Sequence, residues 1–344
     1  MKYYDVNLEV LTPVHVGNGK KISKKDFILD GGRVNVCDPF KLYKAFPQQY
    51  EAFMMDTNSL TNFLTYNRIG NYQSAIKYSM PVADAGSIRN RDSIDEFIKD
   101  PHGLPYIPGS TLKGYIRTAI LNDLVRGEEF DKFRDINNKD TTAQKIEELK
   151  FGKISESIFK SLIISDSLPL STKDLIVCKK VDITVKGNEP KSLLNLCREC
   201  LRPGTKIKFK MAIKHKGDNA FPYDANHILD FIAWFAGDYR DNYSNHFNFK
   251  APKHYDGDIL FLGGGVGYAS KTINYSLYER KDAVKKIAKD LAYRFGSRKK
   301  PDMHNHEKDI EIGVSPHILK CTKVNGVTME MGICRIGINE IEAI

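Results

Sequence analysis

Basic side chains beside glycine turns are the residues of this chain best suited to chemistry, and that chemistry is anion binding. One such group follows Pro108-Gly109, where glycine permits a tight turn and Ser110 is suited to cap a helix. Lys113 and Arg117 lie four residues apart and would sit side by side on that helix. The start of a helix favours phosphate because its N–H groups are free. The alternative is an ordinary capped helix with a solvated basic edge.

A second glycine-rich group lies between Phe261 and Thr272. Backbone amides of such a loop can close on a phosphate, although glycines also serve tight packing alone. The segment nearly spells the nucleotide-binding pattern GxxxxGK[ST], but Ser270 stands where glycine is required, so we predict no nucleotide hydrolysis. Its candidate phosphate-binding residues are Gly263, Gly264, Gly265, Gly267, Tyr268, Ser270 and Lys271.

Three further segments carry candidate phosphate-binding side chains. One is a glycine-containing loop at 12–19 with the lysines after it, and another is a loop at 81–91. The third alternates lysines with apolar residues at 205–213, so a strand would display them in a row, roughly 6–7 Å apart. The alternatives are solvated loops and an edge strand protected by lysine. The candidate residues are His15, Lys20, Lys21, Arg89, Arg91, Lys206, Lys208 and Lys210.

The main alternative to a protein that only binds a phosphate-containing ligand is an enzyme, and specifically a ribonuclease. A metal-independent enzyme would need an acid–base pair, and His15 is the one histidine within a motif. A metal-dependent enzyme would need clustered carboxylates, whereas Asp26, Asp38 and Asp166 are scattered along the sequence. We therefore predict no catalytic residue and no cofactor. A purely structural cap that contacts only protein is a third class.

The cysteines and histidines give no complete metal-binding pattern. The 6 cysteines are expected to be reduced thiols in a chain of this length. Cys197 and Cys200 form a CxxC without the second pair that a structural zinc site requires, so we predict no metal site. The role of this pair stays open, and so does that of the His304/His306 pair in a polar loop, where metal binding is the alternative.

The hydrophobic pattern predicts the elements that would hold these residues. Apolar residues recur at helical spacing after Ser110, and they alternate at strand spacing in several other segments. Trp234, the only tryptophan, is expected in the core. We predict strands at 3–11, 175–185 and 205–213, a hairpin at 27–37 followed by a helix capped by Asp38, and helices at 110–124, 193–201 and 282–295.

Composition favours a globular protein with a polyanionic partner. The 344 residues include 52 Lys and Arg against 43 Asp and Glu, which gives a net charge of +9. No apolar run is long enough to span a bilayer, and the first residues lack the core of a signal peptide. We therefore expect a cytoplasmic protein with no membrane partner.

Four motifs follow one another along almost the whole chain. They are Leu11–Gly17, Tyr106–Gly114 with Ile116–Thr118, Ile164–Ser167 and Gly263–Thr272. The first two motifs resemble those found across the RAMP superfamily. The order and spacing of all four resemble, within that superfamily, the fifth subunit of the Csm effector complex of type III-A CRISPR systems.

The resemblance implies an α+β fold of two ferredoxin-like or RRM-like domains. We place the first at 1–187, with a helical insert at about 40–100, and the second at 188–344. It also implies a non-catalytic subunit that caps the 3′ end of the CRISPR RNA and supports guide-RNA maturation in antiviral defence. The implied partners are CRISPR RNA, neighbouring Csm backbone subunits and recruited host ribonucleases. RNA contact would use glycine loops, helix N-termini and basic side chains rather than base stacking.

Overall fold

A five-stranded antiparallel sheet joins segments that are far apart in the chain. The computed structural model describes residues 1–126, 143–190, 195–249, 257–296 and 306–342. The strand order of this sheet is β11-β14-β1-β10-β7. Its first strand in sequence is also its middle strand, since β1 pairs with β10 on one side and β14 on the other. Alternate residues of β1 form a buried apolar face. The strands are β1 (Lys2–Val10), β7 (Leu162–Ile164), β10 (Lys206–Ile213), β11 (Ile259–Phe261) and β14 (Ile333–Ile341).

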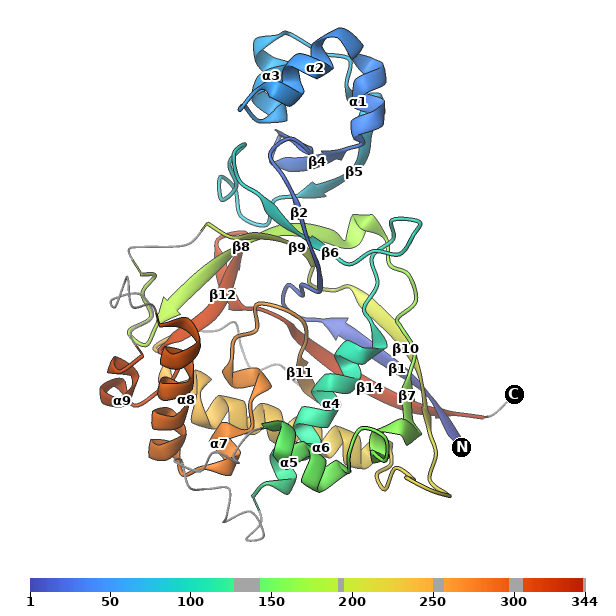
Figure 1. Cartoon of the computed structure of the whole chain (residues 1–344), viewed down its shortest axis with the longest axis vertical. Coiled ribbons are helices and arrows are strands. Elements are labelled where there is room, and N and C mark those ends of the chain that lie inside the picture. The colour runs from blue at the N-terminus through green and yellow to red at the C-terminus, as the bar shows by residue number, and fades with distance from the viewer. Residues whose placement is uncertain (127–142, 191–194, 250–256, 297–305, 343–344) are drawn as a thin grey trace.

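Two long helices cover one face of this sheet (Figure 1). In α4 (Gly109–Leu124) the expected apolar stripe is buried, with Leu112, Ile116 and Ile120 in the core. In α6 (Ala225–Asn242), which Asp224 caps, the buried face leaves Trp234 49% exposed. The prediction that Trp234 is a core residue was therefore wrong, since the helix turns it away from the sheet.

A six-stranded sheet in the order β13-β12-β8-β9-β6-β2 forms the other layer of the body. All its pairs are antiparallel except β6 with β9. The helix predicted at 193–201 was wrong, because residues 197–201 form the central strand β9, paired on both sides. The strands are β2 (Gly17–Ile22), β6 (Ile94–Phe97), β8 (Leu175–Thr184), β9 (Cys197–Leu201), β12 (Ile318–Val324) and β13 (Val327–Glu330).

An insert with its own apolar core projects from the body (Figure 1). The predicted hairpin is confirmed as β3 (Phe27–Asp30) and β4 (Arg33–Cys37), which pair with β5 (Ile76–Pro81). The predicted cap is also confirmed, since Asp38 accepts hydrogen bonds from the amides of Phe40 and Lys41. The helices of the insert are α1 (Pro39–Ala45), α2 (Pro47–Met55) and α3 (Leu60–Tyr66).

Among the described residues, the body has four further α-helices. They are α5 (Ala143–Phe151), α7 (Asn274–Leu277), α8 (Arg280–Phe295) and α9 (Lys308–Ile312). The helix predicted at 282–295 is confirmed as α8, which buries Ala283, Val284 and Ile287. Within the part of the chain that is described, no helix has both the length and the apolar character needed to cross a membrane.

The α+β class is confirmed, and the two predicted halves of the chain are interleaved. In the five-stranded sheet, β1 and β7 come from before residue 187, while β10, β11 and β14 come from after it. The six-stranded sheet likewise combines β2, β6 and β8 with β9, β12 and β13. The segments 1–187 and 188–344 therefore do not each own a large sheet.

The start of α4 touches the end of β7, and this contact requires glycine. A Cβ on Gly109 would collide with the backbone carbonyl oxygens of Ile164 and Ser165. We expect Gly109→Ala to lower the free energy of unfolding in urea by about 1–3 kcal/mol, because the backbone must shift. The control is Gly114→Ala in the same helix, where a Cβ meets open space. That change should stabilise the protein by about 0.5–1 kcal/mol, since alanine favours helix. Equal stability of the two variants would contradict this contact.

Candidate nucleic-acid interface

The two glycine motifs singled out in the sequence meet in space. The amide of Gly264 donates to the carbonyl oxygen of His15 at 2.6 Å, and the two residues form an antiparallel bridge. A Cβ on Gly263 would collide with the same carbonyl oxygen. Gly263, Gly265 and Gly267 all have φ between +83° and +87°, a conformation that glycine adopts without strain. The glycines therefore serve both a left-handed backbone and a close approach.

His15 is buried beside this loop. Its Nδ1 lies 2.7 Å from the carbonyl oxygen of Glu199, and its ring meets Phe97 edge-on with centroids 6.2 Å apart. Burial lowers the pKa of His15, so the imidazole is neutral near pH 7. His15 therefore acts as a packed residue that positions the glycine loop.

A buried ion pair lies directly under His15. The carboxylate of Glu199 is fully buried and accepts from Lys99 Nζ at 2.5 Å, Tyr78 Oη at 2.6 Å and the Phe97 amide at 2.8 Å. Burial and the nearby Glu199 carboxylate raise the pKa of the Tyr78 phenol, so it stays a hydrogen-bond donor. Three donors satisfy one buried charge, and this network joins β5, β6 and β9.

Arg198 points from β9 toward the glycine loop. Its Nε lies 3.7 Å from a carboxylate oxygen of Asp95, and its Nη1 is a buried donor without a hydrogen-bond partner in the described ranges. A Cβ on Gly265 would lie 3.0 Å from that Nη1. A guanidinium with an unused donor beside a loop of glycines is suited to a phosphate oxygen. Arg198 was not among the predicted site residues, because a helix was expected there. The only available signal was a basic residue inside the CxxC pattern.

The polar residues that follow the glycines brace the loop. Lys271 Nζ donates to the carbonyl oxygen of Gly263 at 2.6 Å, and the buried Ser270 Oγ donates to that of Val266 at 3.0 Å. Tyr268 accepts a hydrogen bond from Asn274 at 3.1 Å. These three residues therefore have structural partners inside the motif.

A groove of about 470 Å³ runs from this motif between α4, α7 and α8. Lys271, Lys286 and Arg294 supply its basic groups, while Glu147 and Asp290 supply acidic ones. Lys286 pairs with Asp290 at 3.4 Å. The groove is thus a polar continuation of the glycine loop with a small excess of positive charge.

The N-terminus of α4 is already occupied by an internal carboxylate. The Gly109 amide donates to Asp166 Oδ1 at 2.8 Å, and the Ile107 amide donates to Ser167 Oγ at 2.9 Å. The prediction that Ser110 caps the helix was wrong, because the cap position is Pro108 and Ser110 is an exposed residue of the first turn. The cap comes instead from the Ile164–Ser167 motif. A phosphate at this helix end would compete with Asp166.

Lys113 and Arg117 lie on the same side of α4, as expected. Lys113 is half-buried, and burial followed by the neighbouring charge of Arg117 lowers its pKa. Arg117 is exposed and lies 3.6 Å from Glu147 of α5. The two side chains thus place positive charge beside the groove, where they could bind an anion.

The lysine row of β10 is confirmed, and it lies on the face of the sheet opposite α4. Lys206 pairs with Glu9 at 2.9 Å, and Lys210 pairs with Asp5 at 2.5 Å. The edge-strand alternative was wrong, because β1 and β7 flank β10. Two of the three lysines thus have acidic partners on the neighbouring strand β1. Because the row and α4 lie on opposite faces of the sheet, they cannot form one binding surface.

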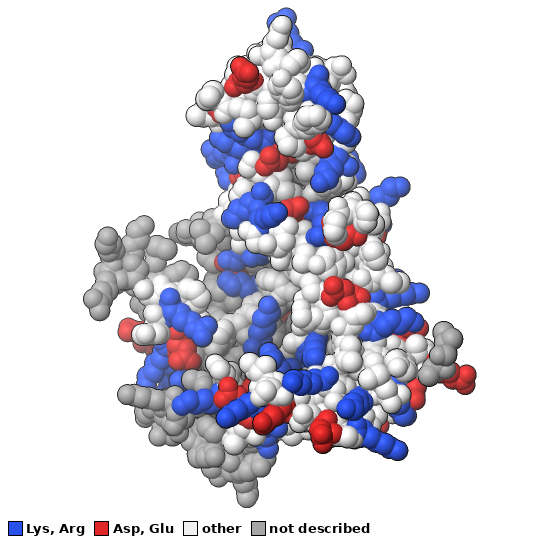
Figure 2. Space-filling view, turned by 45° about the vertical axis from the view of Figure 1, so that its right-hand side comes forward, with Lys and Arg blue, Asp and Glu red and all other residues white. Residues whose placement is uncertain are grey.

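The remaining candidate cations are dispersed. Lys20 and Lys21 are exposed on β2, which replaces the loop expected there, and Lys21 lies 3.4 Å from Asp95. Arg89 pairs with Asp92 at 3.2 Å, and Arg91 is exposed. Figure 2 shows basic and acidic side chains interspersed over the body and the insert instead of one basic patch.

The two cysteines of the CxxC pair lie on opposite faces of one strand. Because Cys197 and Cys200 lie on a strand, an odd spacing places them on opposite faces of β9, and both are buried. They cannot hold one ion together. Of the histidine pair, His304 lies outside the described residues.

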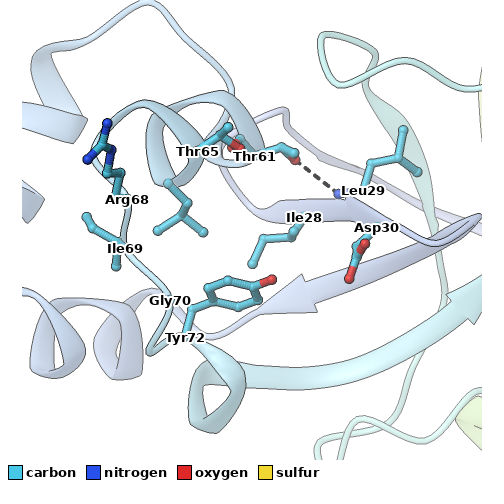
Figure 3. A pocket seen from close by; sticks show the side chains of 10 residues that line it. Ile28, Leu29, Asp30, Thr61, Thr65, Arg68, Ile69, Gly70 and Tyr72 are labelled. Atoms are coloured by element: carbon cyan, nitrogen blue, oxygen red, sulfur yellow. Dashed lines mark hydrogen bonds between the residues drawn. The ribbon is translucent and has the colours of Figure 1, made fainter.

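A pocket of about 340 Å³ in the insert offers no acid–base pair (Figure 3). Ile28, Leu64 and Ile69 line its apolar part. Asp30 and Arg68 are its only charged lining residues, and they lie on opposite sides.

Comparisons with known proteins cover almost the whole chain. A sequence model described as the RAMP superfamily matches residues 7–268. The protein named CRISPR system Cms protein Csm5 of Mycobacterium tuberculosis (strain ATCC 25618 / H37Rv) is 29% identical over 99% of this chain and 99% of its own length. The protein of the same name from Streptococcus thermophilus is 29% identical over 92% of this chain and 97% of its own length.

Two solved structures share the fold. A chain in the cryo-EM structure of a Csm-crRNA-target RNA ternary complex of a type III-A CRISPR-Cas system superposes with a TM-score of 0.70 and 19% identity, over 97% of this chain and 100% of that one. The crystal structure of T. onnurineus Csm5 superposes with a TM-score of 0.64 and 18% sequence identity, over 96% of this chain and 99% of that one.

The bridge between His15 and the glycine loop can be tested by adding one methyl group. Gly263→Ala should cost about 1–2 kcal/mol of unfolding free energy for its left-handed backbone, and about 1–3 kcal/mol more for the collision with His15. Gly326→Ala is the matched control, because Gly326 has φ +78° and open space at its Cβ. It should show only the first cost in urea unfolding. If both variants lose the same stability, the close approach does not matter.

Proposed function

The chain belongs to the RAMP superfamily, and from this premise we propose that it is a non-catalytic RNA-binding subunit of a type III-A Csm effector complex. In this proposal it caps the 3′ end of the CRISPR RNA in the cytoplasm and supports guide-RNA maturation. Support comes from relatives named Csm5 that align over nearly the full length, and from the shared fold with a chain of a Csm-crRNA-target RNA complex.

The observation that carries RNA binding is the glycine loop with Arg198 behind it. The loop is pinned to His15 and braced by Lys271, so it is held in place before a ligand arrives. Positive φ values at Gly263, Gly265 and Gly267 leave no side chain over the backbone. An RNA phosphate could then approach the loop backbone closely, and the Arg198 guanidinium behind Gly265 would add a nearby positive charge.

The proposed contacts recognise the RNA backbone and not the bases. Sequence-specific single-strand readers stack bases on exposed aromatic rings of a sheet. Here the open face of the five-stranded sheet shows Asp5, Asn7 and Glu9 of β1 opposite the lysines of β10. Charged ladders of this kind offer no stacking platform, which suits a subunit that holds guides of any sequence.

The placement of the acidic candidates argues against a ribonuclease site. Asp26 accepts two hydrogen bonds from Ser23, Asp38 caps α1, and Asp166 caps α4. The carboxylates therefore serve three separate local structures. His15 is buried, and its Nδ1 faces a backbone carbonyl. A RAMP-type endoribonuclease would need these groups to converge.

The proposed partners are the CRISPR RNA, neighbouring Csm backbone subunits and, for trimming, recruited host ribonucleases. The insert presents exposed apolar side chains, including Phe40, Met55 and Tyr66, which suit a protein neighbour. If the subunit were only a structural cap, guide binding would show little salt dependence. The salt response of RNA binding therefore separates the two roles.

Removing the basic pair of α4 should weaken binding of single-stranded RNA equally for all sequences. In Lys113→Ala/Arg117→Ala, the slope of log K against log salt should flatten by about 0.7 for each phosphate that is no longer neutralised. The matched control is Lys281→Ala/Lys285→Ala, two exposed cations four residues apart on α8. Fluorescence anisotropy from 50 to 300 mM salt, about the range where such slopes resolve, is the measurement. Sequence-dependent weakening, or an unchanged slope, would overturn phosphate binding at this position.

The purified protein should not cleave RNA. Incubation with end-labelled guide precursor, with and without magnesium or manganese, should leave its length unchanged on a denaturing gel. The reason is the separation of His15, Asp26, Asp38 and Asp166. Cleavage that His15→Ala or Asp166→Ala abolishes would establish the ribonuclease alternative instead.

A further inference from the structure

Two histidines and an aspartate converge at the junction of α9 and β12. His306 and Asp309 are three residues apart at the start of α9, and His317 immediately precedes β12. Each offers one ligand atom, and the three atoms lie within 4.8 Å of one another. His306 Nδ1 is 3.0 Å from Asp309 Oδ2, and His317 Nδ1 contacts Asp309 Oδ1.

The carboxylate of Asp309 is a buried charge without an ordinary cation. It has no exposed surface, and in the described parts of the chain its ion-pair partners are the two histidines, with no lysine or arginine. A buried carboxylate needs compensation by a nearby positive charge. The imidazoles supply hydrogen bonds to the carboxylate, whereas a divalent ion held by all three residues would supply both ligation and charge.

A second layer of hydrogen bonds holds the carboxylate in place. Ser315 Oγ donates to Asp309 Oδ2 at 2.6 Å. Tyr275 of α7 in turn donates to the carbonyl oxygen of Ser315 at 2.5 Å, and its oxygen lies 3.2 Å from the Ser315 amide. Outer partners of this kind orient the ligands of a metal ion. They also tie the cluster to the body of the protein.

We propose that His306, Asp309 and His317 bind one zinc ion, with a fourth position open to water. Two nitrogens and one carboxylate oxygen form a common ligand set for zinc, with bonds of about 2.0–2.1 Å and ligand atoms therefore roughly 3.3 Å apart. The observed spacing approaches this arrangement. Imidazole ligands disfavour magnesium and calcium, which prefer oxygen.

The ion would act as a structural clamp. His306 and Asp309 belong to the α9 segment, while His317 begins the strand that runs into the six-stranded sheet. Zinc would link these two segments, and the link would exist only in the folded protein. Its binding energy would therefore add to folding stability.

No complete metal site was predicted, because His306 has only His304 as a histidine neighbour in the sequence. Asp309 and His317 lie further along the chain, and a turn through Ser315 brings them back. Neither the CxxC pair nor the candidate RNA-binding residues take part. The proposal is thus independent of the proposed function.

The test is zinc loading of the full chain, prepared without a histidine tag. The protein is stripped with EDTA, dialysed against zinc, freed of excess ion and analysed by plasma mass spectrometry. We expect one zinc per chain, a zinc-dependent rise in melting temperature, and visible absorption of tetrahedral type when cobalt replaces zinc. Less than about a tenth of an equivalent of zinc in the wild-type protein would overturn the site, since one ion should fill it.

Variants assign the ion to its ligands. His317→Ala, whose side chain is 31% exposed, and the isosteric Asp309→Asn should each weaken zinc binding by about 100-fold or more. His227→Ala removes a histidine from a similar but exposed His–Asp pair and should retain zinc, as should Cys197→Ser. Circular dichroism confirms that each variant is folded. Full zinc content in folded His317→Ala, or its loss in Cys197→Ser, would refute the assignment.

Discussion

The close approach of two backbones, at His15 and Gly264, is the constraint on which the candidate RNA-binding surface depends. The approach needs a residue without a side chain at 263 and a left-handed backbone at alternate positions after it. It also needs His15 to stay in place, and the hydrogen bond to the Glu199 carbonyl provides this. The buried Lys99–Glu199 ion pair next to His15 therefore helps to fix the position of the glycine loop. A substitution that breaks this ion pair would be expected to change the geometry of the loop as well.

The predictability of this site follows from the range of the interactions involved. Motifs that depend on local backbone geometry were recognisable, because glycine at positive φ and Asp38 before Pro39 are local requirements. The fold class followed from motif order. In contrast, β9 was mistaken for a helix because five residues, of which Arg198 and Glu199 are charged, carry no clear period, and only pairing with its neighbours β6 and β8 makes the segment a strand. Arg198 was missed with it.

Partners across the sheet were also invisible in the sequence. The lysine row of β10 looked like free charge, yet Asp5 and Glu9 of the first strand, far away in the sequence, form ion pairs with Lys210 and Lys206. The net charge of +9 is consequently a poor guide to where an anion binds. Cations matter for RNA where acidic neighbours are missing or weakly placed. That condition depends on strand order, which no local pattern encodes.

The central position of β1 has a consequence for how the protein comes to be folded. Both neighbours of this first strand, β10 and β14, are made much later, and the second of them begins only at Ile333. During synthesis both edges of β1 stay unpaired, because roughly two hundred residues separate it from β10 and roughly three hundred separate it from β14. Native contacts of such long range make folding slow. The body can therefore reach its final form only after nearly all of the chain has left the ribosome, whereas the insert, whose strands are close in sequence, can form early.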